Sequence, residues 1–434
     1  MNKGLTMRLI PALIMAGFAG AASAAGFQLL EQNASGIGNA YAGSAAVADN
    51  ASTIFYNPAG MTQLQEREFS VGVSAVKPSF NFTDKGSSVG NLAGSGDGGD
   101  AGGWGFIPNA YLSWALTKDL YVGLGISGPF GLKTEYDDRW LGAAQGVKFD
   151  IKTLNINPSV AYRLNDKVSL GAGLNWQRID AEYVRMAATT TVGTSHVVST
   201  MKLDDDAWGW NVGALFTLSP STKVGLSYRS EVKYHTTGDV KLADDGTGLG
   251  TATAAGLIAA GRQSDLKAKI TLPDTFIASV SQQLSDKWEM LGDISWTGWS
   301  SIPKVDIMRT SGALNGLNAQ TLDTDFRDTW RVALGANYKY NDAWKLKFGV
   351  AYDETPVKRA ATRLASMPDN NRLWFSTGAQ WMPTKTSKLD LGLAYLYVKD
   401  SKINNNQTAS GRGTLTGEYE ASVWILGAQY SMAF

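Results

Sequence analysis

The sequence predicts an all-β protein: a transmembrane antiparallel β-barrel of about fourteen strands, with an N-terminal helical hatch plugging the lumen. Three observations predict this fold. Apolar residues alternate with small or polar residues in many segments, short polar turns alternate with long connections, and about forty residues near the N-terminus break the alternation. Barrels of this kind cross a bilayer with strands, because a closed sheet pairs all of its backbone groups.

The alternation has the period of a β-strand. In the segment 330–338, Trp330 and Leu334 occupy one face, whereas Arg331 and Asn337 occupy the other. The apolar face lasts about 9–11 residues, which is the length that a tilted strand needs to cross a bilayer. The polar face would line a wet lumen. The same pattern recurs in segments 120–126, 168–176, 344–352 and 389–397.

The connections between these segments are of two kinds. Long, Gly- and charge-rich connections, such as 84–103 and 243–264, alternate with short polar turns, as in barrels with short periplasmic turns and long extracellular loops. An apolar run at 256–260 predicts a short helix that either lines an outer groove or caps the pore. The short turns lie at 117–119, 165–166, 219–221, 285–286, 341–342 and 383–385. Aromatic residues beside them should form the periplasmic girdle: Trp114, Tyr162, Trp288, Tyr340, Trp344 and Trp381.

The N-terminus has the features of a secretory signal peptide. Lys3 and Arg8 precede a short apolar run, and Ala22-Ser23-Ala24 forms a small-residue cleavage site. We therefore divide the chain into a signal peptide (1–24), a hatch (25–65) and a transmembrane barrel (66–434). Export and the barrel pattern together predict a multi-pass protein of the bacterial outer membrane, with outer-membrane lipid as its surroundings.

Composition excludes several other classes. The chain has no cysteine, which excludes disulfides and Cys-ligated metals, and its 39 basic and 39 acidic residues leave no basic surplus for a nucleic-acid partner. No metal-ligand spacing or cofactor motif occurs. The two histidines, His196 and His235, are in no recognisable Ser/His/Asp arrangement, so we do not expect an enzyme.

Residues 25–65 are rich in Ala, Gly, Ser and Asn and contain Ala25 and Phe27 near their start. Asn57-Pro58-Ala59 predicts a helix start, with Asn57 as the cap and Pro58 in the first position. A segment of small residues before the first strand fits inside a barrel. It would serve as a plug, or alternatively extend as a periplasmic tail.

One expected strand is broken. Gly128, Pro129, Phe130 and Gly131 follow the regular alternation of 120–126. Pro129 cannot donate a ladder hydrogen bond, and the glycines allow the backbone to bend out of the pleat. The break predicts either a lateral opening in the wall, suited to a lipophilic cargo, or a bulge that tightens the barrel.

Many segments in order resemble the FadL-type (OmpP1/FadL/TodX) outer-membrane transporters of hydrophobic compounds. Besides residues 25–64 with the Asn57-Pro58-Ala59 triplet, the resemblance rests on GPFGLKTEY (128–136), the segment 154–176, SWTGWS (295–300), the segment 329–357 and MPDNNRLW (367–374). The resemblance implies a fourteen-stranded barrel with a plugged lumen, in which cargo binds near the extracellular loops and leaves sideways into the bilayer through a kink in the third strand.

The resemblance implies long-chain fatty acids as the first candidate cargo, and aromatic or aliphatic hydrocarbons as the alternative. A fatty acid needs an apolar slot and a buried cation. Arg185 matches the arginine that fatty-acid members use, and it shares the lumenal face with Tyr183. The lysine of those members has no clear match. Arg327 is the nearest base. The absence of a matching lysine leaves room for a neutral cargo.

Other functions fit less well. A general diffusion porin would have an open lumen, against which the segment 25–65 and Pro129 argue. A hydrolase would need a catalytic base, and neither histidine of this chain is in a recognisable catalytic arrangement. The terminal Phe434 is an aromatic residue of the kind that barrel-assembly machinery reads, and nothing in the wall suggests a trimer, so we expect a monomer.

Overall fold

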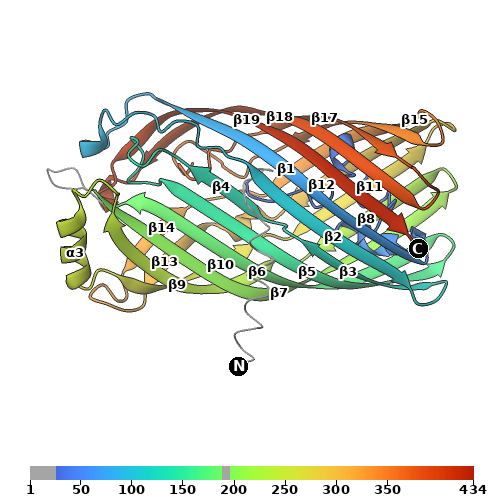
Figure 1. Ribbon diagram of the computed structural model, residues 1–434, viewed down its shortest axis with the longest axis horizontal. Coiled ribbons are helices and arrows are strands. Elements are labelled where there is room, and N and C mark those ends of the chain that lie inside the picture. The colour runs from blue at the N-terminus through green and yellow to red at the C-terminus, as the bar shows by residue number, and fades with distance from the viewer. Residues whose placement is uncertain (1–25, 188–195) are drawn as a thin grey trace.

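One antiparallel sheet runs through the computed structural model, which describes residues 26–187 and 196–434 (Figure 1). The sheet closes because β1 (Arg67–Asp84) pairs on one side with β2 (Gly105–Ala115) and on the other with β19 (Thr414–Ala433). Glu68 lies opposite both Ser113 and Ala433. The predicted signal peptide and the hatch residue Ala25 lie outside the described residues.

Five consecutive strand pairs each form one interrupted wall strand: β3 with β4, β8 with β9, β10 with β11, β12 with β13, and β14 with β15. Counted in this way, the described wall is a closed barrel of fourteen strands, as predicted. The remaining strands are β3 (Leu120–Ser127), β4 (Gly131–Glu135), β5 (Lys148–Asn165), β6 (Val168–Met186), β7 (Val197–Ser219), β8 (Thr222–Arg229), β9 (Val232–Asp244), β10 (Ser264–Leu272), β11 (Thr275–Gln283), β12 (Trp288–Thr297), β13 (Lys304–Arg309), β14 (Asn318–Asp323), β15 (Thr329–Lys339), β16 (Trp344–Asp353), β17 (Arg372–Trp381) and β18 (Ser387–Asn406).

The period-two pattern sets which face of each strand points outward. Along β15, Trp330 and Leu334 are exposed on the outside, whereas Arg331 and Ala333 are buried on the inside. The outside is therefore the apolar face, which suits contact with lipid. The six aromatic residues predicted for the periplasmic girdle are all exposed: Trp114, Tyr162, Trp288, Tyr340, Trp344 and Trp381.

The short turns lie at one end of the barrel and the long connections at the other (Figure 1). The helix α3 (Thr251–Ala259) lies at the end with the long connections, where it packs on β7 and β9 with Ala254 buried. Phe434, at the opposite end, is exposed and lies beside Phe69. Among the described helices, none is both long and apolar enough to cross a membrane. Short 3₁₀ turns lie between strands: η3 (Gly90–Leu92), η4 (Trp299–Ser301) and η5 (Thr408–Ser410).

The N-terminal segment (residues 26–65) lies inside the barrel and is largely buried. It contains η1 (Ile37–Asn39), α2 (Thr53–Tyr56) and η2 (Pro58–Gln63). As predicted, Asn57 caps η2 by accepting a hydrogen bond from the Ala59 amide at 3.1 Å, with Pro58 in the first position. The helix is of the tighter 3₁₀ kind.

Glycines on the inner wall make room for this segment. A Cβ on Gly225 would lie 1.9 Å from the Ala45 carbonyl oxygen, and one on Gly349 would lie 2.1 Å from the Asn39 carbonyl carbon. These distances are too short for any side chain. The close approach of two backbones therefore explains part of the high glycine content.

Candidate functional site

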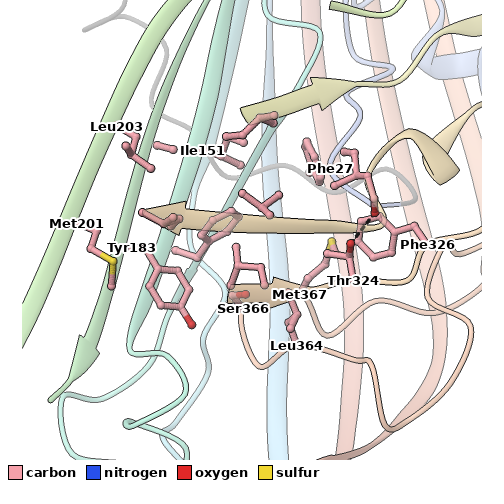
Figure 2. Close-up of a pocket in the computed structure, with 17 residues that line it drawn as sticks. Phe27, Ile151, Tyr183, Met201, Leu203, Thr324, Phe326, Leu364, Ser366 and Met367 are labelled. Atoms are coloured by element: carbon pink, nitrogen blue, oxygen red, sulfur yellow. Dashed lines mark hydrogen bonds between the residues drawn. The ribbon is translucent and has the colours of Figure 1, made fainter. Parts of the chain in front are cut away.

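An apolar cavity lies inside the barrel on the side of the long connections (Figure 2). Its space free of protein atoms, including the part open to solvent, is about 730 Å³. The walls come from β5, β6, β7, β10, β13 and β14, together with Phe27 of the N-terminal segment, Ile302 before β13 and the connections 324–328 and 354–371. Of the lining residues, Thr324 and Ser366 carry aliphatic hydroxyls and the others are apolar or aromatic.

The inner face of β6 explains why the cavity lies at this height. Asn175 and Gln177 belong to a polar layer, in which the Asn175 amide donates to Asn211 at 2.9 Å and Gln177 accepts from the Tyr234 hydroxyl at 2.7 Å. The next inward residues of the strand begin with the apolar Ile179 and Ala181. The side chains of this layer bond one another, and the region above it is apolar.

A second, more open cavity, here called the vestibule, adjoins the first because Leu364 lines both. Its space free of protein atoms is about 1430 Å³, including the part open to solvent. Four arginines line it: Arg185, Arg262, Arg309 and Arg412. The apolar cavity thus has a strongly cationic outer neighbour.

Arg185 is buried at the end of β6. Its Nη1 donates to the Met186 carbonyl at 3.0 Å and its Nη2 to the Ala319 carbonyl at 3.3 Å, whereas its Nε has no partner among the described residues. Tyr183 lies two residues away on the same face and lines the apolar cavity. The two predicted ligand residues therefore lie at the boundary between the two cavities.

Arg327 lies elsewhere. Its side chain is exposed, its Nε donates to the Thr355 carbonyl at 3.1 Å, and it is not among the residues that line either cavity. The neighbouring Phe326 points into the apolar cavity instead (Figure 2). The structure therefore brings Tyr183 and Arg185 together but leaves Arg327 apart.

The third wall strand is interrupted at Gly128–Phe130, between the end of β3 and the start of β4. On the far side, β2 pairs with β3 only from Ala110 to Ala115, so the backbone ladder between β2 and the third wall strand ends before the interruption. Toward β5, Phe130 is still bound, since its amide donates to the Thr153 hydroxyl at 2.9 Å. The break in pairing is therefore on the β2 side.

The N-terminal segment supplies the missing hydrogen bonds. The Leu29 amide donates to the Pro129 carbonyl at 2.8 Å, and the Gly131 amide donates to the Phe27 carbonyl at 2.9 Å. The Gln32 side chain binds both backbone groups of Gly128. These contacts place the N-terminal segment between the barrel interior and the break.

Phe27 connects the break with the apolar cavity. Its ring packs against Phe130 at a centroid distance of 5.9 Å and against Trp299 at 4.9 Å, and it lines the cavity. The preceding Gly26 amide donates to the Asp369 carboxylate at 2.9 Å. Phe27 therefore lies between the cavity and the break.

Comparison with known proteins decides the family. The model of a family described as "Outer membrane protein transport protein (OMPP1/FadL/TodX)" matches residues 15–434. The chain belongs to this family. It is therefore an outer-membrane transport protein rather than an enzyme.

Relatives in the OMPP1/FadL/TodX family match nearly the whole chain. The long-chain fatty acid transport protein of Escherichia coli K12 is 30% identical over 94% of both chains, and outer membrane protein P1 of Haemophilus influenzae is 32% identical over 96% of this chain and 95% of its own. The crystal structure of a Pseudomonas aeruginosa FadL homologue has the same fold, with a TM-score of 0.84 and 23% identity over 94% of this chain and 99% of that one.

Sequence reasoning missed several residues of the site. Leu364, Ser366 and Met367 come from a connection that folds into the barrel, where Tyr136 donates its hydroxyl hydrogen to the Ala365 carbonyl at 2.6 Å. The signal that could have found this connection was the presence of the apolar residues Leu364 and Met367 within a loop. Arg309 had a signal that was not used, because it shares the inward parity of Val305 and Ile307 in β13. Arg412 gave none, because exposed and inward arginines look alike in loops. Among the described residues, no cluster of three or more His, Asp or Glu side chains could hold a metal.

Proposed function

We propose that this protein takes up long-chain fatty acids across the outer membrane. The observation that carries the proposal is an apolar cavity whose outer neighbour presents the buried Arg185, which has no acidic partner among the described residues. An acyl chain would occupy the cavity, and its carboxylate would pair with Arg185 near Tyr183. A carboxylate that leaves water needs such a partner to remain charged. The name of the Escherichia coli relative supports this cargo.

We propose further that the N-terminal segment acts as a hatch and that cargo leaves sideways at Gly128–Gly131. In the described arrangement this segment fills the break with its own hydrogen bonds. Withdrawal of Phe27 would join the cavity to the break, and an acyl chain would then reach the bilayer without crossing the polar layer beneath the cavity. The low-energy destination of an apolar chain is hydrocarbon, so no energy source is required.

Neutral aromatic hydrocarbons are the second candidate cargo. The cavity itself is lined almost wholly by apolar side chains, and Arg185 lines the vestibule instead. Solved structures of the same fold are described as toluene transporters. A general diffusion porin fits less well, because the N-terminal segment occupies the lumen.

The test is a competition assay on purified protein in lipid nanodiscs. A fluorescent long-chain fatty acid would be displaced by oleate in one series and by an alkylbenzene in the other. We expect displacement by oleate at lower concentration, and Arg185→Ala should weaken oleate binding by about tenfold or more through loss of a charge-assisted pair, with little effect on the alkylbenzene. Displacement by the alkylbenzene alone would transfer the proposal to hydrocarbons.

A further inference from the structure

The vestibule carries more positive charge than one carboxylate can balance. Its four arginines come from the end of β6, the connection after α3, the end of β13 and the connection before β19. Among the residues that line it, Asp323 is the one with a carboxylate. Four separate parts of the chain therefore bring guanidinium groups to one space with a single acidic neighbour.

These guanidinium groups act on one another. Arg185 is repelled by the charges of Arg309 and Arg412, and Arg309 is repelled by Arg262. Arg185 and Arg309 are both buried, so solvent does little to screen them. A cluster of like charges in such surroundings costs free energy unless an anion offsets it.

No acidic side chain of the described residues forms an ion pair with the vestibule arginines. The arginine ion pairs in the described parts of the chain belong to others, namely Arg139, Arg178, Arg359 and Arg372. The vestibule arginines bind uncharged acceptors: Arg309 donates to the Arg262 carbonyl at 2.7 Å and Arg412 to Gln407 Oε1 at 3.0 Å. The Nε atoms of Arg185 and Arg412 are buried and have no partner in the part of the chain that the structure describes.

The chemistry of the missing anion follows from this arrangement. A carboxylate carries one charge on two oxygens, whereas a phosphate monoester carries close to two charges on three strong acceptor oxygens. The planar guanidinium group matches phosphate as well as carboxylate. Arg185, Arg309 and Arg412, which are buried or half-buried, can bind one phosphate from several sides. The two oxygens of a single carboxylate are too few to bind all three guanidinium groups.

We infer that the vestibule binds the phosphate-monoester head group of an amphiphile whose alkyl chain lies in the adjoining apolar cavity. This inference rests on the proposed function, because the same cavity holds the acyl chain. Leu364, which lines both spaces, marks where head and chain would meet. Free inorganic phosphate shares the head-group chemistry but would leave the apolar cavity empty.

The test compares ligands of one chain length at pH 8, where a phosphate monoester carries close to two charges. Laurate, dodecyl phosphate, dodecanol and inorganic phosphate would each displace a fluorescent fatty acid from the protein in nanodiscs. We expect dodecyl phosphate to bind at least about tenfold more tightly than laurate, as one further charge-assisted hydrogen bond would give. Dodecanol should bind more weakly than both, and inorganic phosphate should displace the probe only at far higher concentration.

Variants separate the head-group site from the fold. Arg309→Gln and Arg412→Gln should each reduce the preference for dodecyl phosphate over laurate several-fold, while laurate still binds. Arg178→Gln is the matched control. It lies on the outer face of the same strand as Arg185, in surface pairs with Asp180 and Asp204, and should leave the preference unchanged.

Three outcomes would overturn the inference. Equal affinities for laurate and dodecyl phosphate would reject it and leave fatty-acid uptake standing. Displacement by inorganic phosphate as effectively as by dodecyl phosphate would assign the vestibule to free phosphate. Binding of dodecanol alone would reject both this inference and the proposed fatty-acid function.

Discussion

The side chain of Gln32 is hydrogen-bonded to both backbone groups of Gly128. Its Oε1 accepts from the Gly128 amide at 3.0 Å, and its Nε2 donates to the Gly128 carbonyl at 2.8 Å. One carboxamide thus takes the place of a neighbouring strand where the third wall strand is interrupted. The backbone carbonyl of Gln32 accepts a hydrogen bond from the Tyr111 hydroxyl at 2.6 Å, which fixes the backbone of Gln32 to the wall.

We expect Gln32→Leu to loosen the N-terminal segment. The change removes the partner of three buried backbone groups, namely the Gly128 amide, the Gly128 carbonyl and the Leu29 carbonyl, at a cost of about 1–3 kcal/mol for each. Hydrogen exchange measured by mass spectrometry should show faster exchange in peptides covering residues 26–40 and 125–135, and fatty-acid release into vesicles should become faster. Gln28→Leu is the control, because Gln28 bonds Thr297 instead. Equal protection in both variants would argue against Gln32 as the fastening residue.

Replacing Gly128 and Pro129 together by valine should reduce uptake and leave ligand binding intact. The double change restores the backbone donor that proline lacks and favours a continuous strand. Uptake of a labelled fatty acid by cells, compared with binding to purified protein, checks the expectation. Pro158→Val, an exposed wall proline in β5, is the control. Undiminished uptake in the double variant would rule out lateral exit at this position.

Docking of the N-terminal segment should weaken as the pH rises toward neutrality. The Glu31 side chain is fully buried, and burial raises its pKa from 4.5 to about 7, despite the opposing charges of Arg372 and Arg331. The docked state then holds a proton that the released state has lost, so docking is most favourable below about pH 4.5 and weakens between about pH 4.5 and 7.

Hydrogen exchange of residues 26–40 at pH 5 and pH 8, corrected for the intrinsic pH effect, measures this. The wild type should be better protected at pH 5, and Glu31→Gln should show the same protection at both values. A pH dependence that persists in the Gln variant would assign it to another group.

The long connections are fastened by a charged contact, and Asp245→Asn should release it. Asp245 Oδ2 lies 2.8 Å from His196 Nδ1 and 3.3 Å from Arg139 Nη1. Although partial burial opposes it, hydrogen bonding from Thr247, His196 and Arg139 lowers the pKa of Asp245 to about 2. The contact is therefore complete above about pH 3.8 and is lost as the pH falls toward 2.

Limited proteolysis at pH 7 should cut the connections of the Asn variant faster than those of the wild type. Asp239→Asn, which removes an exposed pair with Lys241, is the control and should have no effect. Equal digestion of both variants would make the Asp245 contact incidental.

The sequence predicted the wall well because the alternation of apolar and polar residues within each strand assigns its side chains to the outer or the inner face. Trp330 and Leu334 could be assigned to the lipid face from parity alone, and the short turns set the order of the strands. Asn57 and Pro58 specified their helix start locally. Parity also predicted that Tyr183 and Arg185 share an inward face.

The remaining parts of the site depend on contacts between distant segments. Gln32 meets Gly128 across 96 residues, and Gly26 meets Asp369 across 343. No local sequence pattern predicts these pairings. Arg412 reaches the vestibule through the path of its connection. Arg327, named as the base nearest to the unmatched lysine, is exposed, whereas Phe326 takes the inward position.

These long separations dictate an order of assembly. The N-terminal segment emerges from the export channel before its partners do, since the Ala34 amide must find Gln429 in the final strand, 395 residues later. Its backbone and that of the wall approach too closely at Gly225 and Gly349 for threading into a finished cylinder to be easy. We expect this segment to stay unpaired in the newly exported chain until β1 pairs with β19. Closure of the barrel by this last strand pairing would then enclose the segment.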